Sequence, residues 1–494
     1  MHIAVLSSAV VGVDGLMVEV EVDIAAGLPA TTVVGLGDSA VKESRDRVRA
    51  ALKNSGYECP PRRITVNLAP ANLKKEGSAF DLPIAIGICA ATGQLSSAVL
   101  RDYALLGELA LDGRVKPIRG ALPIAAAVAR RGLRGLLLPR RNAPEAGVVE
   151  GLDVIPIVSL AQAFDFLRGE ATTAPIRVDV ERILAEHGRH ELDFREVKGQ
   201  EHVKRALEVA AAGGHNVIMV GPPGAGKPLL ATRLPAILAP LELAEAIDAT
   251  RVHSVAGLRR DRALVAARPF RAPHHTISDA GMIGGGAIPR PGEVSLAHHG
   301  VLFLDELPEF RKNVLEVLRQ PLEERRITIS RAAGSITYPA NLMLVAAMNP
   351  CPCGYYGDPQ RECTCATVQV ARYRTRISGP LLDRIDIQIE VPAVRYRELS
   401  DQTDSEPSSA IRARVERTRT LQIERFKSRG LYCNAEMGAR DLRNFCDVET
   451  AAETLIETAM TKLGLSARAY TRILKVARTI ADLDGVAVIG AAQV

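Results

Sequence analysis

A glycine-rich loop between a strand and a helix constrains the fold of this chain more than any other feature. Residues 217–220 are a short apolar run, the loop GPPGAGK follows, and residues 229–234 begin a helix. In that setting the glycines let backbone N–H groups surround phosphates, the helix N-terminus adds positive partial charge, and the lysine reaches the terminal phosphates. A chance lysine in a glycine-rich loop is the plain alternative, and the flanking strand and helix argue against it. The candidate phosphate-binding residues are Gly221, Pro222, Pro223, Gly224, Ala225, Gly226, Lys227 and Pro228.

The residue after Lys227 departs from the usual pattern. Such loops normally end in Ser or Thr, whose hydroxyl ligates Mg²⁺, whereas this chain has Pro228. Proline is sterically accepted in a first helical turn, because its missing N–H has no partner within the helix. The sequence therefore predicts nucleotide binding at a magnesium site that lacks one ligand.

Two further strand ends supply the other groups that a nucleotide site needs. The apolar residues 301–304 precede Asp305 and Glu306, so Asp305 is predicted to hold Mg²⁺ and Glu306 to orient and deprotonate the attacking water. An acidic pair after a strand can instead cap a helix, but its combination with the phosphate-binding loop favours catalysis. A third apolar run, residues 342–347, leads to Asn349, whose amide is placed to sense the γ-phosphate or position the water. Short continuous apolar runs of this kind are typical of a buried parallel sheet.

Length and composition indicate a folded protein of several domains. The chain has 494 residues, 47% of them hydrophobic and 24% charged, and at roughly 150 residues per domain this length suggests about three domains. The net charge of +5 permits contact with nucleic acid but falls well short of a dedicated DNA-packing protein. The longest uncharged stretch, residues 82–100, is broken by Pro83 and Gly87, and no secretory signal is evident. We therefore expect no membrane span and a cytoplasmic location.

Four of the eight cysteines are clustered with the spacing C-x-C-x9-C-x-C. In a reducing compartment such a cluster indicates a metal before it indicates disulfides, and four thiolates suit tetrahedral Zn²⁺. The C-x-C spacing is tighter than the usual C-x2-C of structural zinc sites, so four reduced cysteines in a Gly/Pro-rich loop are the alternative. The candidate zinc ligands are Cys351, Cys353, Cys363 and Cys365.

The pattern of apolar residues divides the chain into an N-terminal α+β or α/β module, a nucleotide-binding core and a helical end. Residues 18–24 and 64–68 alternate as strands with one buried face, and helices are expected at 82–91 and 121–130. After residue 409 only helices are expected, at 410–429, 451–463 and 468–483. The predicted domains are residues 1–170, a linker at 171–191, residues 192–397 and residues 398–494.

Longer strings around these motifs make the chain similar to a known family. Residues 268–278 (RPFRAPHHTIS), 291–300 (PGEVSLAHHG), 349–354 (NPCPCG) and 378–386 (SGPLLDRID) closely resemble the ComM/YifB family of magnesium-chelatase-like AAA+ ATPases. The resemblance covers nearly the whole chain, and these strings are far more specific than a lone phosphate-binding loop. It implies a multidomain α/β protein. The N-terminal module would have the ribosomal-protein-S5-domain-2-like fold related to the Lon protease domain, followed by an AAA+ core with a parallel sheet and a C-terminal helical lid.

The resemblance also implies an oligomeric ATPase that works on DNA. Its members form rings, expected here as a homo-hexamer with ATP between subunits. Arg384 would be the arginine finger for a neighbour's γ-phosphate, and Arg468, on the lid, a second sensor for the same nucleotide. ComM-like proteins promote branch migration while incoming single-stranded DNA recombines during natural transformation. The implied activities are ATP hydrolysis and DNA helicase action, the implied ligands ATP and Mg²⁺, and the implied partners single-stranded and branched DNA.

Several local features suit a motor on DNA. Residues 322–331 and 334–338 flank a small-residue turn, as in a β-hairpin that enters a ring's pore, where its arginines would track phosphates. The glycine-rich stretch 281–290 is expected to form a mobile loop facing the same channel, and both features could equally be surface decoration. The basic helix at 412–429 is either a contact for the DNA backbone or a solvated face with its own ion pairs.

The Lon-like module raises a protease hypothesis, which needs a nucleophilic Ser and a Lys base. In this chain the serine position falls on Ala79 and the lysine position on Leu122, so the dyad is absent, and Ser78, one residue away, would lack a base. The leading function is therefore an ATP-driven DNA motor. The alternatives are a chelatase-type subunit that remodels a partner, and an ATP-binding scaffold whose hydrolysis is impaired by Pro228.

Overall fold

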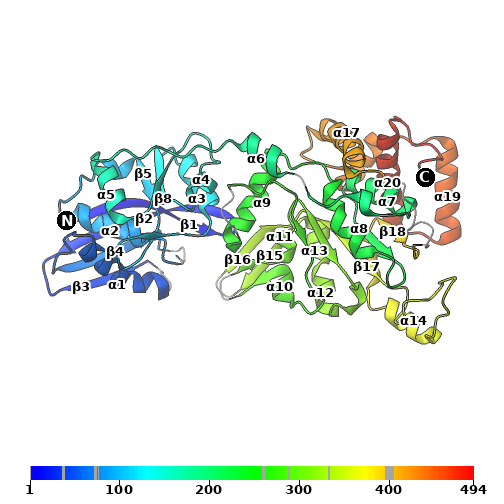
Figure 1. Cartoon of the computed structure of the whole chain (residues 1–494), viewed down its shortest axis with the longest axis horizontal. Helices are drawn as coiled ribbons and strands as arrows, with labels where there is room; N and C mark the ends of the chain where they lie inside the picture. The colour runs from blue at the N-terminus through cyan, green and yellow to red at the C-terminus, as the bar shows by residue number, and fades with distance from the viewer. Residues whose placement is uncertain are drawn as a thin grey trace. The chain divides into compact units, whose positions relative to one another are not determined.

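The computed structural model divides the chain into two compact units, and Figure 1 gives the labels of their elements. One unit consists of Met1–Ile183 and Ala246–Val265, and the other of Leu184–Glu245 and Ala266–Val494. The four-part domain organisation stays a prediction, and its boundary between residues 397 and 398 lies outside the described residues. The described residues are 2–35, 39–71, 75, 77–188, 190–258, 263–286, 289–331, 334–394 and 405–494.

A seven-stranded mixed sheet is the centre of the first unit, in the order β3-β4-β2-β1-β5-β8-β9. β2 runs antiparallel to β1 and β4, and the other neighbours are parallel. The predicted alternation in β2 is confirmed, because Val18, Val20 and Val22 are fully buried whereas Glu19 is exposed. The strands are β1 (His2–Val11), β2 (Asp14–Ala25), β3 (Ala30–Val34), β4 (Arg63–Ala69), β5 (Tyr103–Leu105), β8 (Gly135–Pro139) and β9 (Asp153–Ile157), with a separate hairpin of β6 (Glu108–Leu109) and β7 (Val115–Lys116).

Helices cover both faces of this sheet. Successive residues of β1 point to opposite sides, so that Val5 packs in a core with α1, α2 and α5, whereas Leu6 packs against a second core that includes α3 and α4. α2 and α3 begin within one residue of their predicted positions, and α2 is buried on all sides, which explains why its sequence has no polar face. The helices are α1 (Ser39–Asn54), α2 (Asp81–Ala91), α3 (Ala121–Arg130), α4 (Ala143–Ala146) and α5 (Leu160–Arg168).

A five-stranded parallel sheet is the core of the second unit, in the order β11-β14-β17-β10-β18. The three predicted apolar runs are its central strands. The two outer strands are short and only partly buried, so the apolar pattern did not reveal them. Because all five strands are parallel, their carboxyl ends lie at one edge of the sheet, where α/β proteins bind ligands. The strands are β10 (Val217–Val220), β11 (Phe270–Arg271), β14 (Val301–Leu304), β17 (Met343–Met348) and β18 (Ile387–Glu390).

The C-terminal segment is helical, as predicted, and α17 and α20 pack on α7 (Glu201–Gly213), the helix before β10. The C-terminal helices are α17 (Ser408–Phe426), α18 (Ala439–Phe445), α19 (Thr450–Leu463) and α20 (Ala467–Asp484). The other helices of this unit are α8 (Lys227–Arg233), α10 (Asp279–Ile283), α11 (Glu293–Leu296), α12 (Lys312–Val317), α13 (Arg319–Glu324), α14 (Thr367–Arg374) and α15 (Gly379–Leu382), while α6 (Val180–His187) and α9 (Leu243–Ala256) span the division between units. These elements confirm the predicted α/β multidomain fold class. Within the described ranges, no helix is both long and apolar enough to cross a bilayer.

Candidate nucleotide-binding site

The glycine-rich loop turns from β10 into α8 at the carboxyl edge of the parallel sheet. Gly224 and Gly226 both have φ of 79°, a left-handed conformation that glycine adopts without strain. No atom lies within 4 Å of a Cβ built at either position, so backbone conformation and not crowding requires glycine there. A loop with left-handed residues at such positions allows its backbone N–H groups to point inward and surround a phosphate.

The side chain of Lys227 lies among the predicted residues that follow strands β10, β14 and β17. Its Nζ donates to two carbonyl oxygens of the loop, at 2.6 and 2.9 Å, and to Oδ1 of Asn349 at 3.1 Å. The side chain is buried, which lowers the pKa of Lys227, while the nearby carboxylates Asp305 and Glu306 oppose that shift. The structure thus brings together the lysine, the two acids and the asparagine predicted from separate parts of the sequence.

Glu306 is held in an uncommon backbone conformation directly after β14. Its φ of 50° is left-handed, which costs a non-glycine residue about 1–3 kcal/mol. Its N–H donates to Oδ1 of Asp305 at 2.9 Å, and its carboxylate lies 3.5 Å from Nδ1 of His275. The sequence patterns did not single out His275, although an adjacent pair, His274 and His275, was present in one of the strings that supported the resemblance.

Pro228 fits the first turn of α8 and is exposed. The helical bond from Leu230 N to Gly226 O is intact at 3.0 Å. The next hydroxyl along the helix belongs to Thr232, which donates to the carbonyls of Pro228 and Leu229 at 2.9 and 3.1 Å. This hydroxyl is therefore engaged within the helix, one turn beyond position 228.

The candidate arginine finger lies at the opposite edge of the sheet. The carbonyl oxygen of Arg384 accepts a hydrogen bond from Nδ2 of Asn216 at 2.9 Å, and Asn216 precedes β10 whereas Lys227 follows it. At about 3.3 Å per residue, the two ends of β10 are roughly 10 Å apart. The Arg384 guanidinium pairs with Glu323 and lowers the pKa of that carboxyl, and Arg468 adds to the same effect. The structure therefore places Arg384 and Arg468 near the same carboxylate and separates the backbone of Arg384 from Lys227.

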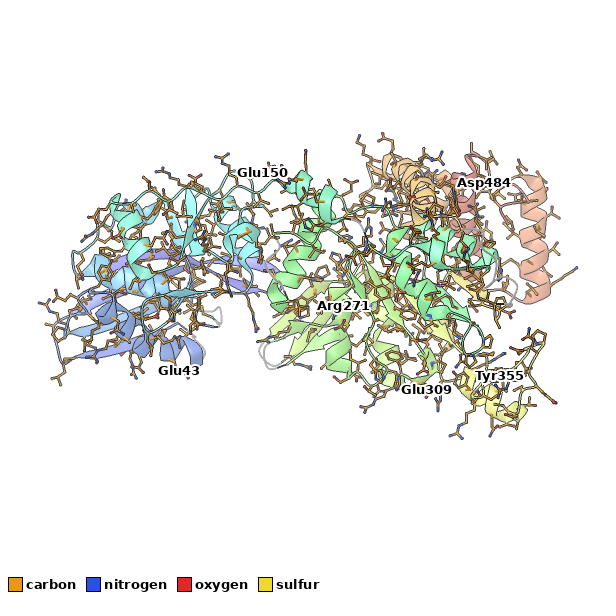
Figure 2. All side chains as sticks on the ribbon, in the orientation of Figure 1. Glu43, Glu150, Arg271, Glu309, Tyr355 and Asp484 are labelled. Carbon is orange, nitrogen blue, oxygen red and sulfur yellow. The ribbon has the colours of Figure 1, made fainter. Side chains whose placement is uncertain are left out.

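The four candidate zinc ligands converge between β17 and α14. The Sγ of Cys351 lies 3.3 Å from that of Cys353 and 3.6 Å from that of Cys363, and all four sulfurs are within 4.8 Å of one another. The N–H of Cys353 donates to the Sγ of Cys365 at 3.3 Å. Four thiolates bound to Zn²⁺ at about 2.3 Å are about 3.8 Å apart, so the cluster has the size of a zinc site. Tyr355, labelled in Figure 2, lies in the same loop.

The predicted hairpin is present as β15 (Arg326–Arg331) and β16 (Gly334–Pro339), and its turn at residues 332–333 lies outside the described residues. One face is buried through Ile327 and Ile329. The other face is exposed and carries two hydroxyl pairs across the strands, Thr328 with Thr337 at 2.9 Å and Ser330 with Ser335 at 2.7 Å. The hairpin thus presents a polar, hydrogen-bonding face.

The glycine-rich stretch forms a second, shorter hairpin against the first. Its strands are β12 (Gly284–Gly285) and β13 (Arg290–Pro291), and residues 287–288 of the stretch lie outside the described residues. The Tyr338 hydroxyl of β16 donates to the carbonyl oxygen of Pro289 at 2.6 Å, and a Cβ at Gly284 would meet Ile329 at 2.8 Å. The two stretches predicted to face DNA therefore belong to one packed structure.

The basic helix α17 is largely paired within the protein. Ion pairs join Arg412 to Glu416, Arg414 to Glu406 and Glu208, and Arg425 to Asp482. These contacts favour the structural interpretation of this helix over a continuous DNA-binding stripe.

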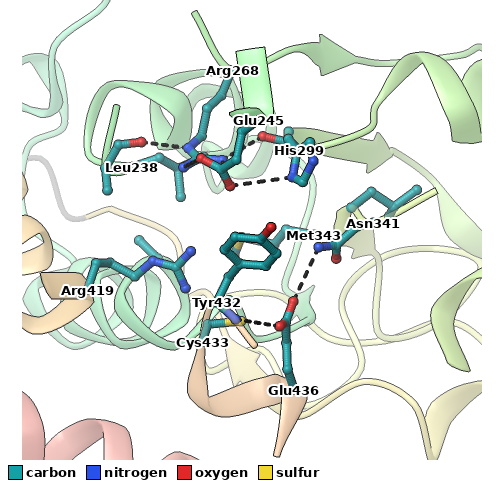
Figure 3. Close-up of a pocket in the computed structure, with 15 residues that line it drawn as sticks. Leu238, Glu245, Arg268, His299, Asn341, Met343, Arg419, Tyr432, Cys433 and Glu436 are labelled. Carbon is teal, nitrogen blue, oxygen red and sulfur yellow. Dashed lines mark hydrogen bonds and ion pairs between the residues drawn. The ribbon is translucent and has the colours of Figure 1, made fainter. Parts of the chain in front are cut away.

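An open pocket lies at the amino edge of the parallel sheet, and residues of the loop before α18 line part of it (Figure 3). Some of its charged side chains are paired: the Arg268 guanidinium donates to Glu245, and Glu436 accepts from Nδ2 of Asn341. Arg419 also lines the pocket, and its buried Nη1 has no hydrogen-bond partner among the described residues. Burial alone would raise the pKa of Glu245, but hydrogen bonds and charges from His299 and Arg268 outweigh it, so that this pKa lies below its usual range. None of the predicted nucleotide-binding residues lines this pocket, so we assign it no nucleotide.

The positions of a Lon-type dyad carry apolar side chains. Ala79 packs against the core that contains Ala121 and Ile124 of α3, and Leu122, in the same helix, is buried. The hydroxyl of Ser78 donates to the carboxylate of Glu108 and not to a lysine. These positions offer no Ser–Lys pair.

Comparisons with known proteins agree with this architecture. The family model described as "Magnesium chelatase, subunit ChlI" matches residues 193–399, "Subunit ChlI of Mg-chelatase" matches residues 20–142, and "Magnesium chelatase, subunit ChlI C-terminal" matches residues 405–494. The chain is 44% identical over 484 residues to "Competence protein ComM" of Haemophilus influenzae, covering 97% of this chain and 94% of that protein. It is also 44% identical over 478 residues to "Uncharacterized protein YifB" of Escherichia coli, covering 96% and 92%. A "Lon protease" of Mycolicibacterium smegmatis is 31% identical over 165 residues, which cover 31% of this chain and 21% of that protein.

Proposed function

This chain belongs to the magnesium-chelatase ChlI-like family of AAA+ proteins, with ComM and YifB among its relatives, and we propose that it is an ATP-driven ring motor on DNA. The proposed task is branch migration of incoming single-stranded DNA during natural transformation, performed by a homo-hexamer. The observation that carries the proposal is the convergence of Lys227, Asn349, Asp305 and Glu306 at one sheet edge, with Arg384 at the other. The relative named as a competence protein supports the biological setting.

The proposed chemistry follows from the contacts of each residue. Lys227 leaves the loop carbonyls for the β- and γ-phosphates, and Asn349, its present partner, is then free to bind the γ-phosphate or the attacking water. Glu306 orients and deprotonates that water, while its backbone conformation and His275 fix the carboxylate. Asp305 would hold Mg²⁺, which neutralises charge on the transferred phosphoryl group.

The two arginines support a ring with shared sites. The backbone of Arg384 lies at the sheet edge opposite to its own phosphate-binding loop, so the nucleotide that its guanidinium would serve on release from Glu323 would belong to a neighbouring subunit. Arg468, near the same Glu323, would serve that same nucleotide. Each site would thus need two subunits, as heterologous contacts in a closed ring provide.

The decisive test is steady-state ATP hydrolysis by the purified chain with and without single-stranded and branched DNA, followed by branch migration of a labelled junction. Hydrolysis stimulated by DNA, together with junction movement that needs ATP, would support the motor. A chelatase-type subunit would instead show no response to either DNA. An ATP-binding scaffold impaired by Pro228 would bind ATP without turnover in this chain and would hydrolyse it only in the Pro228→Thr background.

We expect the polar face of the β15–β16 hairpin to contact DNA. Replacing Arg326 and Arg331 together by glutamine should weaken binding of single-stranded DNA by about 10-fold and flatten its salt dependence, because each phosphate contact releases a counterion. The measurement is fluorescence anisotropy across a salt series. Arg417→Gln, on the exposed face of α17, is the matched control and should bind as the parent does. Equal loss in both variants would contradict a specific role for the hairpin.

We also propose that the four-cysteine cluster holds one Zn²⁺ ion that fixes the loop between Asn349 and Arg384. The observation that favours it is the clustering of four sulfurs within 4.8 Å of one another. Elemental analysis should find about one zinc per chain, and Cys353→Ser should reduce this to about one tenth or less. Cys59→Ser, at an isolated cysteine, is the control. A chain without zinc, when purified without chelators, would show that the cysteines are merely reduced.

A further inference from the structure

His215 is a fully buried histidine that contacts both the segment carrying Arg384 and the helix carrying Arg468. Its Nδ1 lies 3.3 Å from Oδ2 of Asp386, two residues after Arg384, and its Nε2 lies 2.8 Å from Oγ1 of Thr479 on α20. The residue follows α7 and immediately precedes Asn216 and β10. It therefore sits where the sheet, the arginine segment (residues 380–386) and the helical lid meet.

The local sequence makes room for this contact. A Cβ at Gly213 would come within 2.2 Å of His215 Nε2 and 2.6 Å of Thr479 Oγ1, so any other residue there would displace the ring. Gly214 has φ of 70°, and a Cβ there would lie 2.7 Å from Sγ of Cys433. Two consecutive glycines thus allow the lid to approach the ring of His215 closely.

Its partners fix which ring nitrogen carries the proton. A carboxylate only accepts hydrogen bonds, so Nδ1–H of His215 donates to Asp386. On the other side of the ring, Nε2 lies 2.8 Å from Oγ1 of Thr479, whose hydroxyl also donates to the carbonyl oxygen of Lys475 at 2.9 Å. Nδ2 of Asn434 donates to the same Oγ1 at 3.1 Å, which holds the threonine in place. This is the arrangement by which an acidic partner orients an imidazole.

The arginine segment is held from two further sides. Asn216 donates from Nδ2 to the carbonyl oxygen of Arg384 and accepts at Oδ1 from the N–H of Leu344 at 2.8 Å. From the lid, Arg472 donates to the carbonyl oxygen of Ile385 at 2.8 Å. These bonds fix the backbone, whereas His215 contacts the side chain of Asp386.

We propose that His215 is a positioning residue for Arg384: through Asp386 and Thr479 it fixes the arginine segment against the lid, so that the subunit presents Arg384 to a neighbour's nucleotide. This inference rests on the proposed function, in which the ATP site is shared between subunits. It predicts that His215 affects turnover at the neighbouring site and leaves nucleotide binding at its own site intact.

The variants His215→Gln and His215→Asn each keep a polar group near one ring nitrogen, so they separate the contact with Asp386 from the contact with Thr479. Glutamine keeps a polar group near Nε2 and the lid but loses the donor to Asp386, whereas asparagine keeps a donor near Nδ1 and loses the lid contact. We expect His215→Gln to lower kcat for ATP by about 100-fold, since a small misplacement of a catalytic group costs about that much, with KM changed less than about threefold. His215→Asn should recover at least about 10-fold of this loss. Asp386→Ala, which removes the acceptor for Nδ1–H, should resemble His215→Gln and provides a second route should one variant unfold.

Mixing subunits tests the action on a neighbour. His215→Gln keeps a working phosphate-binding loop and Lys227→Ala keeps a working Arg384, so a one-to-one mixture restores complete sites at about one quarter of the interfaces. We expect the mixture to hydrolyse ATP at about that fraction of the unmixed parent rate. The reference mixture is Arg384→Ala with Lys227→Ala. All are assayed in this chain and in the Pro228→Thr background.

The outcomes are distinguishable. Recovery in both mixtures supports the inference. Recovery only in the reference mixture would overturn the role of His215 while the shared site stands. Recovery in neither would refute the shared site itself, and with it the inference. If His215→Asn is as slow as His215→Gln, Asp386 is not the contact that positions the arginine.

Discussion

ATP hydrolysis by the Pro228→Thr variant is expected to exceed that of the parent chain by about 100-fold, equivalent to ~2.7 kcal/mol of transition-state stabilisation. The first turn of α8 begins at Lys227, and Pro228 offers no hydroxyl to the magnesium ion that Asp305 is proposed to hold. Thr232, one turn further, is engaged with helix carbonyls. Threonine at position 228 would restore the ligand without disturbing the loop, because the site is exposed and the helical bond from Leu230 to Gly226 already exists.

The proline has a second consequence that the experiment must separate. It removes a backbone N–H at the start of α8, where N–H groups face a bound phosphate. Pro228→Ala restores this N–H without a hydroxyl and is therefore the matched control. The hydroxyl argument requires that threonine, but not alanine, raises kcat and lowers the magnesium concentration needed for half-maximal rate.

The measurement is steady-state hydrolysis at a series of magnesium concentrations, with Lys227→Ala introduced into each variant. Lys227→Ala should reduce every rate to background, which assigns the activity to this loop. Equal rates in the parent and in Pro228→Thr would refute the idea of a lost ligand. A gain with alanine as large as that with threonine would assign the effect to the N–H group.

Much of the fold follows from periodicity. The three apolar runs became β10, β14 and β17, and α2 and α3 lie within one residue of their predicted ranges. These elements are long enough, or buried enough, that the need to bury apolar side chains determines their pattern of apolar residues. The outer strands β11 and β18 and the seven-residue α18 were not predicted, because so few residues establish no period and their conformation depends on the neighbours they pack against.

Some contacts of the candidate site could likewise be predicted from the sequence, and others could not. The convergence of Lys227, Asn349 and the two acids follows from parallel strands whose ends meet at one edge. The contacts of His275 and His215 do not follow from spacing, since each joins residues brought together only by tertiary packing. His215 and Thr479 are 264 positions apart, and the signal beside His215, two consecutive glycines, indicates close approach without naming the partner.

Removing the guanidinium of Arg384 is expected to lower kcat by about 1,000-fold, because an arginine finger stabilises charge that develops only in the transition state. An interaction made only in the transition state leaves substrate binding unchanged, so the ATP affinity of the variant should change less than about threefold. Lysine at this position should recover little, since a point charge does not reproduce the planar donor geometry of arginine.

The matched control for Arg384→Ala is Arg376→Ala, which removes a guanidinium from the same region. Arg376 is half-exposed and pairs with Glu309, a surface ion pair expected to contribute less than about 1 kcal/mol. The measurement combines steady-state hydrolysis with equilibrium binding of a fluorescent ATP analogue. A parallel loss of turnover and affinity in Arg384→Ala would show that this arginine contacts ATP already in the ground state and would contradict a role confined to the transition state. Loss of turnover alone, with Arg376→Ala at the parent rate, is the result expected of an arginine that neutralises γ-phosphate charge in the transition state, and the mixture of Arg384→Ala with Lys227→Ala then tests whether that arginine comes from a neighbouring subunit.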